Sequence, residues 1–371
     1  MPSRLGKGLF YLLFLPAAIA FSGWQGWSWW SWATDPVELA ASAETSPDVP
    51  SAPNAPDTIA AAVQIEIPIG TSSQQIGQDL EAAGLIRSST AWNLWTRWQL
   101  FQQPEAGYQA GTYLLSPTQS LQDIAAVLAS GDVVTRSFTV PEGWNREQIA
   151  AALAEAGFFT AEEFLRQTEI IPTEQYLWLP ENLPHLEGFL FPDTYQIAVE
   201  QITPAAVVAM MLDRFEKTAL PLYQQAPETD LLDWVTLASI VEKEAVVAEE
   251  RSTIAGVFDN RLRESIPLGA DPTVEYGLGI SQTPENPLTL SQVQTPNPYN
   301  TYLNVGLPPT PISNPGLASL EASLNPAETD FLYFVARYDG THVFSRTLQE
   351  HEAAQAKIRD EIDQVISPSG N

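Results

Sequence analysis

The stretch IEIPIGTSSQQIGQDLEAAG, residues 65–84, shows how the first folded part of the chain is built. A short β-branched run reaches a turn at Pro and Gly, an apolar stripe at helical spacing follows, and a Gly ends the stripe. The same pattern returns 73 residues later, from Pro141 to Gly157, and a looser copy lies between Pro117 and Gly131. Each copy predicts a strand, a turn and a helix with Gly at its C′ position.

The repeated units predict a small α+β module over residues 63–140. Its strands are expected in the segments IEIPI, TYLLS and RSFTV, and a longer helix is expected from about Thr90 to Gln103. Two interpretations fit this pattern. One is a glycan-binding module of the LysM kind, and the other is a set of recurrent strand-turn-helix units without that role.

An apolar segment near the N-terminus predicts a membrane anchor. Leu9 to Trp32 contains no charged residue and is long enough to cross a bilayer, which takes about 20 residues. An A-x-A sequence at residues 18–20 leaves a cleaved signal peptide as the alternative. Indole rings favour the membrane interface, and the segment ends in five tryptophans: Trp24, Trp27, Trp29, Trp30 and Trp32.

The charges around this segment predict its orientation. Arg4 and Lys7 precede it, and no other Lys or Arg occurs before Arg87. The positive-inside rule therefore puts a tail over residues 1–8 in the cytoplasm and the bulk of the chain outside. We expect a single-pass protein of the plasma (inner) membrane, with a transmembrane helix over 9–32 and a periplasmic or extracytoplasmic folded part.

Residues 33–62 predict a disordered linker between the anchor and the folded part. The segment is rich in Pro, Ala, Ser and acids and shows no periodic apolar pattern. Such composition produces an extended tether rather than a packed element.

The composition excludes several classes of protein. With 17 Lys and Arg against 45 Asp and Glu, the net charge of −28 argues against a general nucleic-acid binder, which needs a basic face. The absence of cysteine excludes disulfides, thiolate nucleophiles and Cys-ligated metal sites. Three histidines leave little room for a multi-His site, and no P-loop, G-x-G-x-x-G, H-E-x-x-H or G-x-S-x-G motif occurs. We expect no metal and no organic cofactor.

The larger folded part is expected over residues 141–366, as a mixed α+β domain. FLYFVARY followed by Gly340 and THVFS predicts a β-hairpin. Residues 267–315 are mostly irregular, and a segment of that length inside a domain is usually functional. Helical patterns cover 203–218, 228–250, 251–264, 316–324 and 347–366.

A carboxylate lies on the apolar stripe of the helix predicted over 228–250. Trp234, Leu237, Val241 and Ala248 share one face, and Glu244 falls on it, whereas Glu242 lies between faces. Burial raises the pKa of a carboxyl and favours a proton donor near neutral pH. The alternative is a surface carboxylate that ends the stripe and pairs with a nearby Arg251 or Lys243.

Other polar clusters have both a functional and a structural interpretation. Glu187 to Tyr195 (EGFLFPDTY) puts two acids in an aromatic turn, which alone is often structural. Asp271 has the position of a helix N-cap. Asn297 to Tyr302 (NPYNTY) is dense in hydrogen-bonding and stacking groups, which suit sugars and also suit an ordinary loop.

Several long motifs together resemble the MltG-type (YceG-like) endolytic murein transglycosylases. They occur in the family's order and cover about residues 64–360. The motifs are EGFLFPDTY (187–195), LASIVEKEA (237–245), VFDNRLRESIPLGADPTVEYGLG (257–279), NPYNTYLNVGLPPTPISNPG (297–316), SLEASLNP (319–326) and LYFVARYDGTHVFS (332–345). Thr310 and Glu352 depart from the family pattern, and neither belongs to the Glu-Lys-Glu element that contains Glu244.

The resemblance implies a membrane-anchored enzyme with a LysM-like subdomain that cleaves nascent peptidoglycan strands, beside peptidoglycan synthases as candidate partners. The second Glu of the Glu-Lys-Glu element, Glu244, is implied as the catalytic acid. Candidates for holding the sugars are Asp271, Tyr299, Asn300 and Thr301, with Glu187, Asp193 and Tyr195 as supports of the cleft or only as braces. Two other activities remain open: a non-catalytic glycan-binding scaffold, and a hydrolase that uses Glu244 with a second acid such as Asp271.

Overall fold

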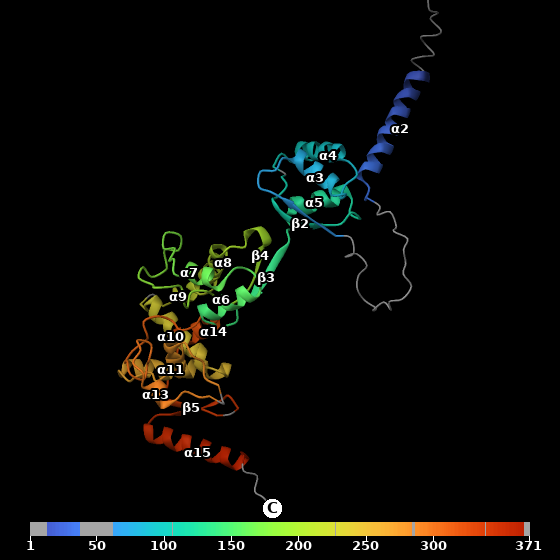
Figure 1. Cartoon of the computed structure of the whole chain (residues 1–371). Helices are drawn as coiled ribbons and strands as arrows, with labels where there is room; N and C mark the ends of the chain where they lie inside the picture. Colours follow the sequence, from blue (N-terminus) through green and yellow to red (C-terminus); the bar gives the residue numbers. More distant parts are fainter. Residues whose placement is uncertain are drawn as a thin grey trace, which may run out of the picture. The chain divides into compact units, whose positions relative to one another are not determined.

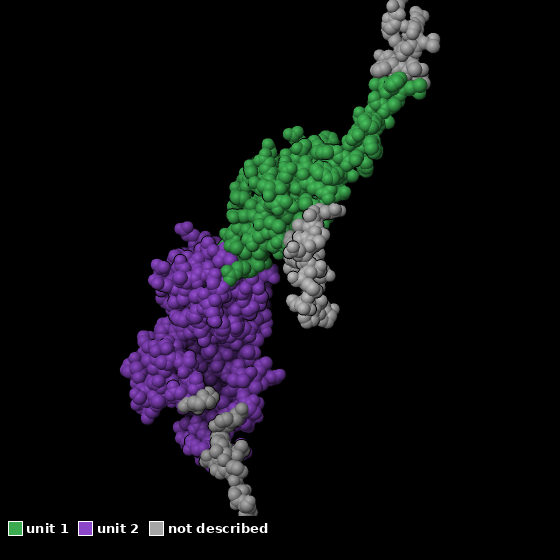
Figure 2. Space-filling view, turned by 45° about the vertical axis from the view of Figure 1, so that its right-hand side comes forward, with its two compact units in different colours: residues 1–136, 197–201 green, residues 137–196, 202–371 purple. Residues whose placement is uncertain are grey.

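The computed structural model describes residues 13–37, 62–105, 107–226, 228–283, 286–337 and 339–366. The chain divides into two compact units (Figure 2). Unit 1 comprises residues 1–136 and 197–201, and unit 2 comprises residues 137–196 and 202–371. The predicted tail and most of the predicted linker lie outside the described residues, and the domain limits at 63–140 and 141–366 stay predictions.

The part of unit 1 over residues 63–130 combines a two-stranded sheet with three helices among its described residues (Figure 1). Strands β1 (Val63–Ile67) and β2 (Gly111–Leu115) are antiparallel, with Ile65 opposite Tyr113. The helices are α3 (Ser73–Ala82), α4 (Ser89–Gln102) and α5 (Leu121–Ser130). Ser72 caps α3 by accepting from the Gln75 amide, and Ser120 forms a capping box with Asp123 at the start of α5.

The core of unit 1 lies between this sheet and these helices. Tyr113, Trp92, Leu80 and Ile124 are all fully buried in one cluster. Gly131 ends α5 with a φ of 71°, a left-handed conformation that L side chains rarely adopt. The mixed α+β fold predicted from the repeated pattern is confirmed, with each strand within two residues of its expected start.

Helix α2 (Leu15–Thr34) also belongs to unit 1. Residues 9–12 of the segment expected to cross a membrane lie outside the described residues. Among the described residues, no helix is long and apolar enough to cross a membrane. The last turn of α2 packs on the unit: Ala33 is buried in its core, and Arg87 donates to the carbonyl oxygen of Trp32 at 3.1 Å.

The first half of unit 2 continues the strand-turn-helix pattern. Strand β3 (Thr135–Thr139), which begins at the end of unit 1, pairs with β4 (Thr194–Ala198). Asn145 starts helix α6 (Arg146–Glu155) through a capping box with Gln148, and Thr160 starts α7 (Ala161–Thr168) in the same way. The short 3-10 helix Val199–Gln201 follows β4.

The second half of unit 2 is mainly helical. Helix α10 packs against α11 and α14, and Trp234 of α10 donates to the carbonyl oxygen of Leu320 in α14 at 2.9 Å. The elements are α8 (Pro204–Thr218), α9 (Leu220–Tyr223), α10 (Leu231–Glu244), a 3-10 helix (Ala248–Glu250), α11 (Arg251–Arg263), α12 (Asp271–Leu278), α13 (Leu290–Val293), α14 (Leu317–Leu324), β5 (Tyr333–Ala336), β6 (His342–Ser345) and α15 (Leu348–Ile366). The hairpin of β5 and β6 is confirmed.

Two details differ from the sequence-based prediction. The helix expected to run to residue 250 ends at Glu244, because Ala245 adopts extended angles (φ −86°, ψ 101°) before the β-branched Val246 and Val247. Ala248 therefore does not continue the apolar stripe. Asp271 does not cap α12: Ala270 is the N-cap residue, and Asp271 is the first residue of the helix.

Candidate active site

Two hollows in unit 2 share part of their walls. One has a volume of about 590 Å³ and the other about 660 Å³, and Lys243 and Pro272 line both. The smaller hollow also reaches the N-terminal end of α6 and the ring of Tyr299. The larger one is bordered by α10, the start of α12 and the hairpin of β5 and β6. Both hollows thus border the end of α10 and the start of α12.

Glu244 is the last residue of α10, and its side chain lines the larger hollow. In the described part of the chain, no hydrogen bond or ion pair occupies its carboxyl group. Burial raises its pKa to about 8, and the negative charges of Asp271 and Glu275 act in the same direction. The carbonyl end of a helix also disfavours a negative charge. A pKa of about 8 favours the protonated form of Glu244 near neutral pH, and no partner for that proton is present among the described residues.

The neighbouring acid Glu242 is placed differently. Its Oε2 accepts a hydrogen bond from the backbone amide of Gly316 at 3.1 Å, so it connects α10 to the start of α14. It lines neither hollow. Two carboxylates two residues apart thus have distinct surroundings, and only Glu244 is available to a molecule in the hollow.

Asp271 lines the same hollow as Glu244. Its Oδ1 accepts a hydrogen bond from the hydroxyl group of Tyr302 at 2.7 Å. This bond occupies one carboxylate oxygen of Asp271. Asp271 raises the pKa of Glu244 and that of Tyr302.

Arg261 of α11 lines the larger hollow, as the cation Lys243 also does. Its guanidinium group donates to three backbone carbonyl oxygens, those of Leu332, Pro267 and Leu268, and pairs with no carboxylate among the described residues. Its positive charge lowers the pKa of Glu244, against the effects of burial and the neighbouring acids. The guanidinium carbon also lies 5.0 Å from the ring centre of Tyr333, which lines the hollow as well.

Tyr299 lines the smaller hollow. Its hydroxyl group is 2.8 Å from the hydroxyl of Thr310, and its ring meets that of Tyr276 edge to face with 4.9 Å between centres. Both rings are partly open to the hollow, which suits contact with the C–H face of a sugar. Thr310, one of the two departures from the family pattern, holds Tyr299 and does not line either hollow.

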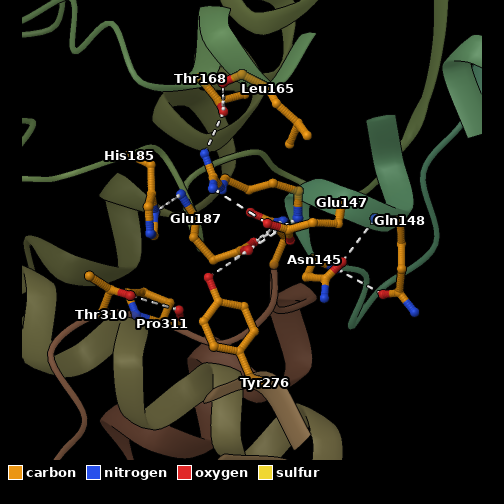
Figure 3. A network of polar contacts seen from close by, with 12 residues as sticks. Asn145, Glu147, Gln148, Leu165, Thr168, His185, Glu187, Tyr276, Thr310 and Pro311 are labelled. Atoms are coloured by element: carbon orange, nitrogen blue, oxygen red, sulfur yellow. Dashed lines mark hydrogen bonds and ion pairs between the residues drawn. The ribbon is translucent and has the colours of Figure 1, made fainter. Parts of the chain in front are cut away.

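Glu187 is buried at the centre of a polar network rather than in a hollow (Figure 3). Its carboxyl group accepts from the amide of Arg146 at 3.1 and 3.2 Å, from Asn314 Nδ2 at 2.9 Å and from the hydroxyl of Tyr276 at 3.2 Å. Burial raises its pKa to about 8, while the bond from Arg146 opposes the shift. Glu187 therefore braces the start of α6, the segment around Asn314 and helix α12.

Asp193 and Tyr195 also line neither hollow. Asp193 forms an ion pair with Arg214 and accepts from the amide of Thr194. The ring of Tyr195 stacks on Phe138, and its hydroxyl group donates to the carbonyl oxygen of Phe191. Of the two sequence-based interpretations, the bracing one describes what these two side chains do in the structure.

Asn300 and Thr301 are buried, and their polar atoms are used within the chain. Asn300 Nδ2 donates to the carbonyl oxygens of Val293 and Thr295. Thr301 Oγ1 accepts from the amide of Ala270 at 3.0 Å, which fixes the start of α12. These side chains shape the segment beside the hollows and have no free polar group directed into them.

Three residues of the site were not on the list of sequence candidates. Arg261, Glu275 and Tyr302 all border a hollow, and the first two act on the pKa of Glu244. Tyr302 is the last residue of the NPYNTY motif. One feature of the sequence could have pointed to Arg261: the chain has only 17 Lys and Arg among 371 residues, so each cation is a candidate for a specific role. Among the described residues, no group of three or more His, Asp or Glu side chains is arranged to hold a metal ion.

Comparison with known proteins gives the family. The model of the YceG-like family matches residues 65–357. The chain belongs to the YceG-like family. Its relatives include proteins named endolytic murein transglycosylase. The one from Bacillus subtilis is 33% identical over 311 residues, which is 80% of this chain and 84% of that protein. The one from Streptococcus pneumoniae is 33% identical over 323 residues, which is 78% of this chain and 57% of that protein.

A solved structure of the same family supports the fold. The crystal structure of a YceG-like protein from Listeria monocytogenes is 30% identical to this chain and superposes with a TM-score of 0.54. The match covers 79% of this chain and 99% of the Listeria chain. The family match over residues 65–357 includes the end of α10 and the segment that follows α11, both of which line the hollows.

Proposed function

We propose that this chain is an endolytic lytic transglycosylase. It would cleave the β-1,4 bond between N-acetylmuramic acid and N-acetylglucosamine in peptidoglycan strands and leave 1,6-anhydro-muramic ends. The observation that carries the proposal is the position of the Glu244 carboxyl group, which lines an open hollow without a hydrogen-bond or ion-pair partner among the described residues. Burial raises its pKa to about 8, which suits a proton donor near neutral pH. The names of the relatives from Bacillus subtilis and Streptococcus pneumoniae support the substrate class.

In the first step Glu244 acts as a general acid. Its proton passes to the glycosidic oxygen as the bond from that oxygen to C1 of the muramic residue breaks, and the glucosamine unit leaves with a 4-hydroxyl. The acetamido oxygen of the muramic residue stabilises the positive charge that develops at C1. The negative charge of Asp271, beside Glu244 in the same hollow, acts in the same direction.

In the second step Glu244 acts as a general base. The O6 hydroxyl of the muramic residue attacks its own C1, the new C1–O6 bond forms, and the O6 proton returns to the Glu244 carboxylate. No water is consumed, and one carboxyl group carries both proton transfers. Paired-carboxylate hydrolysis, in contrast, needs a second acid to act on water or as a nucleophile.

The two hollows support cleavage within a strand rather than at its end. A glycan chain that crosses Glu244 needs space for sugars on both sides of the cut bond. The larger hollow contains Glu244, and the smaller one continues beyond Lys243 and Pro272 toward Tyr299. We assign sugar contacts to Asp271, Tyr299 and Tyr302, because each of these side chains lines one of the hollows.

The sequence supports three further parts of the proposal. Residues 9–32 would anchor the chain in the plasma membrane with the N-terminus in the cytoplasm. Residues 63–140 would serve as a LysM-like glycan-binding subdomain. Peptidoglycan synthases would be partners, because nascent strands are their product.

The test is the chemistry of the products. Purified peptidoglycan strands are incubated with the protein, and the new ends are identified by mass spectrometry. The proposal expects 1,6-anhydro-muramic ends and fragments from within the strands. Reducing ends would establish a hydrolase, for which Asp271 is the second acid in the same hollow. Strand binding without cleavage would establish a scaffold.

A further inference from the structure

Helix α4 of unit 1 carries large apolar side chains both in the core and at the surface. One face, with Ala91 and Trp92, is buried in the core of the unit. A separate outward face presents Leu94, Trp98 and Phe101, which follow one another at spacings of four and three residues and are 46%, 52% and 86% exposed. Large exposed apolar side chains gathered on one face often mark an interaction surface. The outward face of α4 therefore has the character of a contact surface.

A second set of exposed aromatic residues lies on another helix of the same unit. Helix α2 exposes Trp24, Trp27, Trp29 and Trp32. Helix α2 contacts α4 (Figure 1). Trp30 of α2 packs against the core of unit 1. The guanidinium group of Arg87 lies 5.7 Å from the ring centre of Trp32. The tryptophans of α2 and the outward face of α4 thus belong to one unit and are joined through a packed contact.

The charges on this part of the chain differ from those of the rest. The protein has a net charge of −28, yet residues 85–104 contain Arg87 and Arg97 and no acidic residue. Arg97 lies between Leu94 and Trp98 on the exposed side of α4. Exposed tryptophans accompanied by arginines, without acids, are the side chains that a bilayer surface with anionic headgroups attracts.

We propose that the outward face of α4 rests in the headgroup region of a membrane that contains anionic lipids. Leu94, Trp98 and Phe101 enter the interface, and Arg97 contacts the phosphate groups. Unit 1 is then held against the membrane by its own surface in addition to the N-terminal segment. This contact is independent of the proposed chemistry at Glu244.

The absence of cysteine makes a site-specific test possible. A nitroxide label is attached to Phe101→Cys in the full chain, which is reconstituted into vesicles of phosphatidylethanolamine and phosphatidylglycerol. Leu114→Cys is the matched control, because Leu114 is an apolar residue, 57% exposed, on the face of β2 turned away from the buried Tyr113 and Leu115. Collision of each label with oxygen, which concentrates in lipid, and with a water-soluble nickel complex is measured by electron paramagnetic resonance.

The proposal expects the oxygen-to-nickel ratio at position 101 to exceed that at position 114 severalfold. Adding Arg97→Glu to the Phe101→Cys chain is expected to reduce that ratio. Equal ratios at the two positions would overturn the proposal. Protection of position 101 by a second copy of the chain would overturn it as well. Spin–spin broadening at position 101 that disappears on dilution with unlabelled protein would reveal such a contact.

Discussion

Tyr302 donates its hydroxyl hydrogen to Asp271 at 2.7 Å, beside the carboxyl group of Glu244. The bond holds the negative charge of Asp271 in a fixed place, and that charge raises the pKa of Glu244. The pKa of Glu244 therefore depends in part on Asp271, which Tyr302 holds in position.

Replacing Asp271 by Asn is expected to move the alkaline limb of the pH profile of kcat/KM to lower pH. Without the neighbouring negative charge the pKa of Glu244 falls from about 8, so its proton is lost at a lower pH. A shift of about 0.5 to 1 unit is expected. The control Tyr302→Phe keeps the charge and should shift the limb less. An unchanged limb in Asp271→Asn would contradict this coupling.

Arg261 is expected to act on Glu244 in the opposite direction. Arg261→Gln removes the positive charge, so the pKa of Glu244 rises and the alkaline limb moves to higher pH. Arg261→Lys keeps the charge and should leave the limb near that of the unchanged protein. Both variants lose bonds to backbone carbonyl oxygens, and both are expected to lose about 1–3 kcal/mol of unfolding free energy. Similar pH profiles for the two variants would show that the charge does not matter.

The stability of the protein should also report the proton on Glu244. The folded state holds this proton up to about pH 8, whereas an ordinary Glu loses it near 4.5. The contribution of Glu244 to stability is therefore fully present below about pH 4.5 and is lost as the pH rises toward 8. Glu244→Gln, which cannot ionise, should become more stable than the unchanged protein over that range, by about 1–2 kcal/mol at pH 8 after screening by the open hollow.

The matched control for this stability effect is Glu242→Gln. It weakens the bond to the Gly316 amide and should lower the unfolding free energy by about 1 kcal/mol. Urea unfolding at several pH values measures both variants. A constant difference between Glu244→Gln and the unchanged protein from pH 4.5 to 8 would show that the pKa of Glu244 is not raised.

Asn314 is expected to be critical for the fold. Its side chain is buried and makes four hydrogen bonds, accepting from the amides of Gly188 and Leu190 and donating to Trp144 and Glu187. Asn314→Ala leaves these groups unpaired and should cost about 2–4 kcal/mol. The exposed Asn325 is the control, since Asn325→Ala should cost about 0.5 kcal/mol or less. A small loss for Asn314→Ala in urea unfolding would contradict the bracing role of the network.

The sequence was sufficient to predict most of the elements, and it pointed to Glu244 as the acid, which stays a prediction. The repeated Pro-x-Gly pattern predicted strands and helices, because turns and caps depend on local side chains such as Ser120 and Asn145. It also predicted that Glu244 shares the buried side of its helix. The length of that helix was wrong, because the change of backbone direction at Ala245 depends on tertiary packing as well as on the two valines.

The polar residues around the site were harder to assign. Asn300, Thr301 and Glu187 have the side chains that suit sugars, yet the fold uses them to bond backbone and neighbouring groups. A sequence gives the type of a polar group and not whether a partner already occupies it. The sequence also does not show that Arg261 lies near Glu244, because the two residues come together only when α10 and α11 pack against each other.

The most direct test of the account compares the cleavage rates of Glu244→Gln and Glu242→Gln on isolated peptidoglycan strands, at pH 7 and at equal concentrations of folded protein. The account predicts that Glu244→Gln loses at least about 100-fold in rate, the usual contribution of a general acid, whereas Glu242→Gln keeps most of it. Retained cleavage by Glu244→Gln, with loss in Glu242→Gln, would move the acid to Glu242 and contradict the proposed mechanism.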